Sequence, residues 1–154
     1  RTVAAPLTPD EIAQRAAAEH KRRAEEAERM RQLRLDQALL ETYRSVQDLD
    51  SRRDRELREL DRSIRELRTR ESELIERQRV MIDEATHTDK SDVAASLEAD
   101  IRLLDSEIAA QSSVVAAKLR ERNAVVERFE EHRRRYVELT SAPESARIPP
   151  MPRR

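Results

Sequence analysis

The chain of 154 residues contains no glycine. Glycine makes up roughly 7% of an average protein, and it is the residue that adopts left-handed backbone conformations without a steric cost. Tight hairpins and close approach of the backbone to a ligand therefore have no permissive residue here. A glycine-rich phosphate-binding loop is excluded outright. We expect few loops and long regular elements.

The amino-acid composition indicates which elements these are. Aromatic residues make up 2% of the chain and charged residues 41%, so the side chains that fill an ordinary globular core are scarce. A chain rich in Ala, Glu, Arg and Leu with apolar residues every 3.5 to 3.6 positions is typical of long helices and coiled coils. We predict an all-α fold with a long charged N-terminal helix followed by an antiparallel coiled-coil helical hairpin.

The charge is balanced overall but uneven along the chain. With 31 basic and 32 acidic residues, no net field attracts nucleic acid or anionic lipid. The stretch from Asp83 to Glu107 carries a net charge of -6 and the stretch from Arg52 to Arg70 one of +3. The absence of cysteine excludes disulfides and thiolate metal sites. No apolar run approaches the roughly 20 residues that span a bilayer, so no transmembrane segment is expected, and the start at Arg1 instead of Met suggests a processed fragment.

The N-terminal helix has a clear start and an uncertain end. After residues 1–7, predicted to be disordered, Thr8 can act as N-cap, Pro9 fits the first helical position and Glu11 closes a capping box. We predict a charged, solvated helix over 8–44. Ser45 then offers a second N-cap, with an acidic residue three positions later. Since no Pro or Gly enforces a break there, one continuous helix remains the alternative.

The hairpin is predicted over 45–140. A first apolar series alternates steps of three and four residues, and the segment 86–92 loses this spacing and is rich in turn formers, so we place the chain reversal there. If the turn centres near residue 88, Leu60 faces Ala117 and Leu74 faces Leu103 and Leu104. The four prolines in 141–154 predict a disordered tail. The two series are Leu57, Leu60, Ile64, Leu67, Glu71, Leu74, Gln78, Met81 and Ala85, and Leu97, Ile101, Leu104, Ile108, Gln111, Val115, Leu119, Arg122, Val126, Phe129, Arg133 and Tyr136.

Two groups of residues are candidates for a structural role. The only aromatic residues, Tyr43, Phe129 and Tyr136, are predicted to gather at the open end of the hairpin, where they would form an aromatic latch. Four polar residues occupy seam positions, where they weaken the helix pair but restrict its register and its partner; they are Glu71, Gln78, Gln111 and Arg122. A homodimer with a four-helix arrangement would cover them.

The residues that carry chemistry do not form a recognisable site. His20, His87 and His132 lack the spacing of metal ligands. Three acids in 48–54 are neutralised by three arginines in 52–55, which favours helix capping and ion pairing over cation binding. The stretch "HRRRY" at 132–136 is interpreted as a solvated face of mixed charge. We predict no catalytic, cofactor-binding or metal-binding residue, and no small-molecule substrate. The expected protein is not an enzyme.

A family resemblance adds a location. The stretch "LDQALLETYRSVQDLDSRRDREL" from Leu35 to Leu57, with "LTPDEIA" at 7–13 and "YVEL" at 136–139, resembles the C-terminal coiled-coil region of a family of uncharacterised proteobacterial cell-envelope proteins. In that family a signal peptide and a small N-terminal domain of unknown function precede the helical region. The resemblance implies a location in the periplasm or cell envelope. It implies no site residue, because the family has no established activity.

These observations lead to one expected function and one alternative. We expect a non-enzymatic coiled-coil interaction, spacer or scaffold protein, which binds a protein partner or associates with itself, a homodimer being one form. The alternative is a nucleic-acid-associated helical protein that uses the basic stretches 52–70 and 118–135. An enzyme ranks third, because it requires a pocket that this composition hardly permits.

Overall fold

The computed structural model describes residues 5–141 as three helices, α1 (Pro9–Thr42), α2 (Val46–His87) and α3 (Ser91–Ser141), and this part of the chain has no strand. The prediction of an all-α chain with a helical hairpin is therefore confirmed. Residues 1–4 of the predicted disordered N-terminus, and the predicted disordered tail from residue 142 onwards, lie outside the described residues.

Local sequence signals account for both ends of α1. The Thr8 hydroxyl accepts a hydrogen bond from the Glu11 backbone N–H at 3.2 Å, while the Glu11 carboxylate accepts one from the Thr8 N–H, so the predicted capping box is present. At the other end Tyr43 is in an extended conformation and caps the helix by donating its N–H to the Leu39 carbonyl. Helix α2 begins only at Val46, so this region contains two helices. The alternative of one continuous helix, which the sequence also allowed, is therefore wrong.

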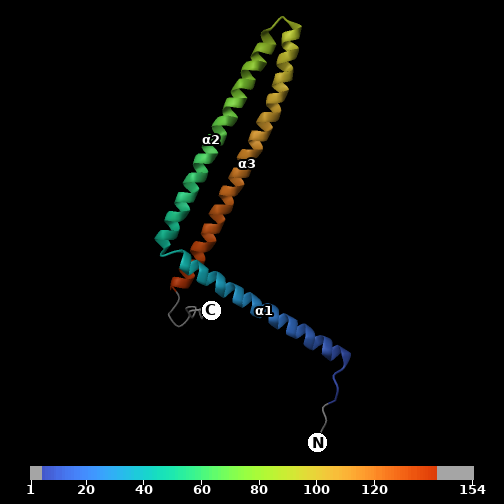
Figure 1. Ribbon diagram of the computed structural model, residues 1–154, viewed down its shortest axis with the longest axis vertical. Coiled ribbons are helices and arrows are strands. Elements are labelled where there is room, and N and C mark those ends of the chain that lie inside the picture. The colour runs from blue at the N-terminus through green and yellow to red at the C-terminus, as the bar shows by residue number, and fades with distance from the viewer. Residues whose placement is uncertain (1–4, 142–154) are drawn as a thin grey trace. The chain divides into compact units, whose positions relative to one another are not determined.

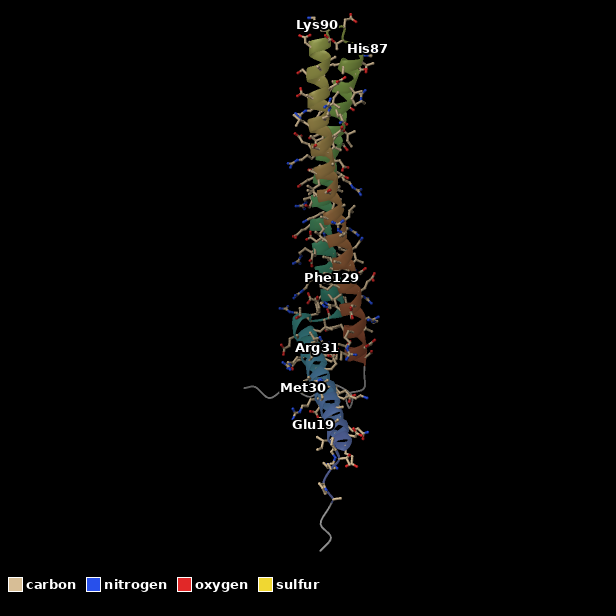
Figure 2. All side chains as sticks on the ribbon, turned by 90° about the vertical axis from the view of Figure 1, so that its right-hand side faces the viewer. Glu19, Met30, Arg31, His87, Lys90 and Phe129 are labelled. Carbon is tan, nitrogen blue, oxygen red and sulfur yellow. The ribbon has the colours of Figure 1, made fainter. Side chains whose placement is uncertain are left out.

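Helices α2 and α3 form the hairpin. They lie side by side and run in opposite directions (Figure 1), joined by residues 88–90 inside the segment 86–92 where the sequence places the reversal. His87 and Lys90 lie at the end where the chain reverses, and Phe129 lies far from it along α3 (Figure 2). No described residue has a positive φ angle, so both connections are made without the conformations that would require glycine.

The described residues form two compact units. The first contains residues 5–46 and 134–141, which are α1 with the last part of α3. The second contains residues 47–133, which are the paired parts of α2 and α3. Each unit has its own buried residues, and each is described separately below.

Burial in the second unit follows the predicted seam near the turn. On α2, every seam position from Leu67 to Ala85 is partly buried and every residue between these positions is exposed. On α3, the same alternation of three and four residues holds from Ala94 to Val115. This is the burial pattern of two amphipathic helices that shield each other along one narrow stripe.

Beyond Val115 the predicted seam of α3 agrees with the burial at Arg122, Phe129 and Tyr136, but it is wrong by one residue at two positions between them. The sequence pattern places Val126 and Arg133 on the seam, whereas Val125 is the more buried of the two neighbouring valines and Arg133 is exposed. The pattern misleads because Leu119 and Val126 are themselves apolar and partly buried beside the stripe. Apolar residues on both sides of the stripe cannot select its phase, and only the packing against α2 does.

The predicted residue pairing needs a matching correction. Leu103 and Ala117 are exposed, so they do not face Leu74 and Leu60 as predicted, although Leu104 is buried. The hydrogen bond from Gln111 to the Leu67 carbonyl instead places the pairing about one residue further along α3. The predicted turn centre near residue 88 caused this shift, since the connection spans residues 88–90.

Candidate interaction surfaces

Two of the predicted polar seam residues bond to the backbone of the opposite helix. The Gln78 amide donates to the Ile101 carbonyl at 3.2 Å and to the Asp105 carboxylate, and the Gln111 amide donates to the Leu67 carbonyl at 2.9 Å. These contacts join α2 and α3 across the seam. Because every residue has a backbone carbonyl, a glutamine can meet another carbonyl after a slide, so it is the contact of Gln78 with the Asp105 carboxylate that distinguishes one register from the next.

Arg122, the third polar seam residue, contacts a charged side chain of the opposite helix. Its Nε donates to the Asp61 carboxylate at 2.6 Å, and this bond lowers the pKa of Asp61 and raises the pKa of Arg122. Both side chains are about one-third exposed, so the pair contributes more to register than to stability. Glu71, the fourth position, is partly buried on α2.

Two further ion pairs continue this series toward the open end of the hairpin. Arg128 donates to both oxygens of Glu56, at 3.0 and 2.8 Å, and Arg133 donates to Asp50 at 3.0 Å. Together with the Gln78, Gln111 and Arg122 contacts, they join α2 to α3 at intervals over most of the second unit. We call these five contacts the polar ladder.

The first unit contains an ion pair that the sequence analysis did not predict. Asp36 of α1 is a buried charged residue, with its side chain only 4% exposed, and it accepts a bidentate pair of bonds from Arg135 of α3 at 2.8 and 2.6 Å. The Gln32 amide donates a third bond, at 2.9 Å. The Arg135 hydrogen bonds lower the pKa of Asp36 despite the opposing effect of burial, because they stabilise the carboxylate.

A signal for this pair was present in the sequence. Asp36, Leu39 and Tyr43 follow one another at steps of three and four residues, so an acid occupies a position on the buried stripe of α1. Such an acid requires a cationic partner. The interpretation of 132–136 as a solvated face is consequently wrong for Arg135, which binds a buried carboxylate, and for Tyr136, which is buried.

Two of the three predicted latch residues come together in the first unit. The Tyr43 and Tyr136 rings meet edge to face, with centroids 6.3 Å apart, and the Tyr136 hydroxyl donates to the Tyr43 carbonyl at 3.3 Å. That bond satisfies a carbonyl at the end of α1, where no helical partner is available. The ring pair and the Asp36 ion pair thus attach the end of α1 to the end of α3.

Phe129, the third latch residue, belongs to the second unit and is 4% exposed. Its ring meets the His132 ring at a centroid distance of 6.4 Å, and the Arg128 guanidinium lies 5.1 Å from its centre. Burial, followed by the charge of Arg128, lowers the pKa of His132. A latch that includes all three aromatic residues remains a prediction.

The remaining candidate residues take part in ion pairs or lie on the surface. Asp50 and Asp54 both accept hydrogen bonds from Arg53, and Asp48 accepts one from Arg52. His20 and His87 are exposed. Within residues 5–141, no group of three or more His, Asp and Glu side chains is placed to hold a metal ion, and no helix there is long and apolar enough to cross a membrane.

Comparisons with known proteins add no relative to this description. Neither the protein families, nor the curated proteins, nor the solved structures that were searched contain a match to the chain.

Proposed function

We propose that the chain is a non-enzymatic scaffold or spacer, in which α2 and α3 form an antiparallel coiled coil of fixed register that presents its outer faces to other proteins or to a second copy. The polar ladder is the observation that supports this proposal. It joins two long helices at Asp50, Glu56, Asp61, Leu67 and Gln78 of α2, over a length of about 42 Å at the rise of an α-helix.

A fixed register matters more for a spacer than for most other proteins. The apolar stripe between α2 and α3 repeats every three or four residues. If the stripe were the only contact, the helices could also pair in registers shifted by one repeat. The cross-helix ion pairs, and the contact of Gln78 with Asp105, disfavour the shifted registers, because a slide separates these side chains from their partners. The hairpin can then hold two binding partners at a constant separation.

A distance measurement tests this proposal. With spin labels at Arg55 on α2 and Glu98 on α3, both exposed, helix rise predicts a separation of about 38 Å along the hairpin. We expect a single narrow distance distribution in the whole chain. The double variant Gln78→Ala, Arg122→Ala should broaden it, and a broad distribution in the unaltered protein would contradict a fixed spacer.

The location of the scaffold is part of the proposal. The resemblance of 35–57 to envelope proteins supports a site of action in the bacterial periplasm or cell envelope, where a spacer of this kind would join two envelope components. Fractionation of the organism that encodes the chain, with detection by antibody, is expected to place it with periplasmic or membrane-associated proteins. Recovery with cytoplasmic markers alone would remove this part of the proposal.

One surface feature favours nucleic acid as the alternative partner. Arg62, Arg65 and Arg70 line an open hollow of about 360 Å³ on α2, together with Thr69 and two glutamates. Phosphate binding there would make affinity fall steeply with salt. Titration with duplex DNA at low salt separates the two functions, since the scaffold predicts no binding. Binding that is lost in the variant Arg62→Gln, Arg65→Gln would replace the scaffold with the alternative.

A further inference from the structure

Four arginines form a row on the exposed side of α2, opposite the buried Leu60. They follow one another at steps of three, four and three residues. At the pitch of an α-helix they therefore lie within about 80° of one another around the axis and span about 15 Å along it. All four side chains are exposed. We call these residues the arginine row; they are Arg55, Arg58, Arg62 and Arg65.

The arginine row has no counter-ion in the part of the chain that the structure describes. None of its four members takes part in an ion pair or a side-chain hydrogen bond there, whereas Arg122 and Arg128 of α3 each bond to an acid of α2. The guanidinium groups of the row are therefore available to an external ligand.

The packing of the hairpin explains why nearby acids do not neutralise the row. Asp61 lies within three or four residues of two members of the row, which is the spacing of helical ion pairs, but it bonds to Arg122 on the opposite helix. Asp54 lies four residues before Arg58 and bonds instead to Arg53. The acids closest to the row on this side are thus already paired with other arginines.

The local charge around the row is positive, although the whole chain carries -1. On α2, residues 55–70 contain six basic and four acidic residues, and on α3, residues 115–128 contain four basic and two acidic residues. The bonds of Arg122 to Asp61 and of Arg128 to Glu56 place these two stretches beside each other. Together they carry a net charge of +4. A ligand that binds here should therefore be negatively charged.

We infer that the arginine row binds an acidic helix of a partner protein, with one line of carboxylates facing the four guanidinium groups. The width of the row favours this ligand. Glu59 and Glu66 are exposed on one flank, and Asp54 and Asp61 lie on the other, so the positive strip is only one line of side chains wide. A DNA duplex or an anionic lipid surface would also bring negative charges against these flanking acids.

The spacing of the row favours the same ligand. Successive arginines are three or four residues apart, which is about 4.5 or 6 Å along the axis. Carboxylates on one line of another α-helix repeat at the same intervals, whereas a DNA duplex carries one charge per about 1.7 Å of its axis. The planar guanidinium group of arginine also matches a carboxylate with two parallel hydrogen bonds.

This inference rests on the proposed function, because it names the chemistry of one protein partner of the scaffold. The probe is a fluorescent, alanine-based helical peptide of about 20 residues, with four glutamates at the spacing of the arginine row. Fluorescence anisotropy with the whole chain measures binding. At low salt we expect weak, saturable binding that is lost near 1 M salt, where exposed charges are screened. The same peptide with glutamine in place of glutamate should not bind.

Charge-removing variants then locate the binding. The double variant Arg58→Gln, Arg62→Gln removes the two central cations of the row and should raise the dissociation constant of the peptide about tenfold or more. The matched control Arg15→Gln, Arg29→Gln removes two exposed arginines of α1. Its net charge changes by the same amount, so an unaltered affinity would show that position and not total charge determines binding. Circular dichroism should show the same helix content in both variants.

Four results would overturn the inference. The first is no binding of the glutamate peptide at low salt, and the second is an equal loss of affinity in the two variants. The third is duplex DNA, or vesicles of phosphatidylglycerol, that bind more tightly than the peptide and depend on the same arginines, which would assign the row to phosphates. The fourth is a dimer that forms through the row and excludes the peptide, which would assign it to a second copy.

None of these results changes the separation between labels at Arg55 and Glu98 in the free chain, which tests the spacer itself. A narrow distance distribution without peptide binding would leave the spacer intact and reject the acidic partner. A broad distribution would reject the spacer even if the peptide binds. The two proposals can therefore fail independently.

Discussion

At the residue scale, Asp36 shows how one buried charge depends on a distant part of the sequence. Its carboxylate is almost fully buried, and its cationic partner Arg135 lies 99 positions later and is 39% exposed. A buried ion without its partner costs far more than an exposed one, because water can solvate only the exposed group. Loss of Arg135 should therefore destabilise the folded protein more than loss of Asp36.

This inequality gives a first prediction. Arg135→Met keeps the aliphatic stem but leaves Asp36 buried with only the Gln32 amide, so we expect the free energy of unfolding to fall by about 3 kcal/mol. Asp36→Asn leaves Arg135 free to reach water and should cost about 1 kcal/mol. Urea denaturation followed by circular dichroism measures both. Equal losses, or a larger loss for Asp36→Asn, would show that the carboxylate is not buried as described.

His132 gives a second prediction, on pH dependence. Burial and Arg128 hold the pKa of His132 below its ordinary 6.5, with a smaller opposing effect of Glu131. The unfolded chain then binds the proton more readily than the folded one. Its contribution to stability is complete above pH 6.5 and is lost as the pH falls through the lower folded pKa.

The measurement compares melting temperatures at pH 7.5 and pH 5 for the unaltered chain and for His132→Gln. The decrease on acidification should be larger in the unaltered chain, because the variant lacks the group that takes up the proton. His20 and His87 are present in both proteins, so the difference between them isolates His132. An equal or larger decrease in the variant would contradict a depressed pKa.

At the element scale, the helices differ in what holds them in place. Helix α1 begins with a complete capping box, yet its residues from Glu11 to Gln32 are exposed apart from the partly buried Glu19, so capping and local ion pairs such as Arg22 with Glu19 and Glu26 support this part. Helices α2 and α3 depend on each other's apolar stripe. Their stability resides in the few layers where large side chains are buried, such as those with Leu49 and Phe129.

A third prediction compares two layers of α3. Phe129→Ala removes a ring that is 4% exposed and should lower the free energy of unfolding by about 3 kcal/mol or more. Leu97→Ala, at a partly buried position near the turn, should cost about 1 kcal/mol, since water already reaches that side chain. Thermal denaturation of the two variants in parallel checks the order, and similar small losses would argue against a well-packed layer at Phe129.

At the scale of the whole molecule, the chain forms two compact units, and the hairpin unit carries the polar ladder. The apolar stripe holds α2 and α3 together, whereas the ladder selects one register among those that the stripe permits. The proposed spacer function therefore depends on polar contacts that add little to stability. Their loss should change the geometry of the hairpin before it changes the melting temperature.

A fourth prediction tests the hairpin pairing. Spin labels at Glu59 and Ala117, both exposed, should lie within about 20 Å of each other, because packed helix axes are 8–10 Å apart and the labels extend outward. The measurement uses dilute protein, so that only distances within one chain contribute. A separation of several nanometres would mean that α3 does not return along α2.

Some of this architecture could be predicted from the sequence because its causes are local. The start of α1 follows from Thr8 and Glu11, which lie three residues apart, and the reversal follows from a short segment without apolar residues. The polar seam positions could be named from spacing alone. Their partners at Ile101, Leu67 and Asp61 could not, because a helical period fixes which side of a helix is apolar but not what lies opposite.

By itself, then, the sequence determined an all-α chain, the start of its first helix and the site of its reversal, since each of these depends on residues within a few positions of one another. Only the tertiary structure decided that Val125 and not Val126 is buried, that Asp36 binds Arg135 and that Tyr43 meets Tyr136. These outcomes depend on how two helical surfaces fit together. Where one helix has several similar apolar or charged residues side by side, its own sequence does not determine which of them the opposite helix covers.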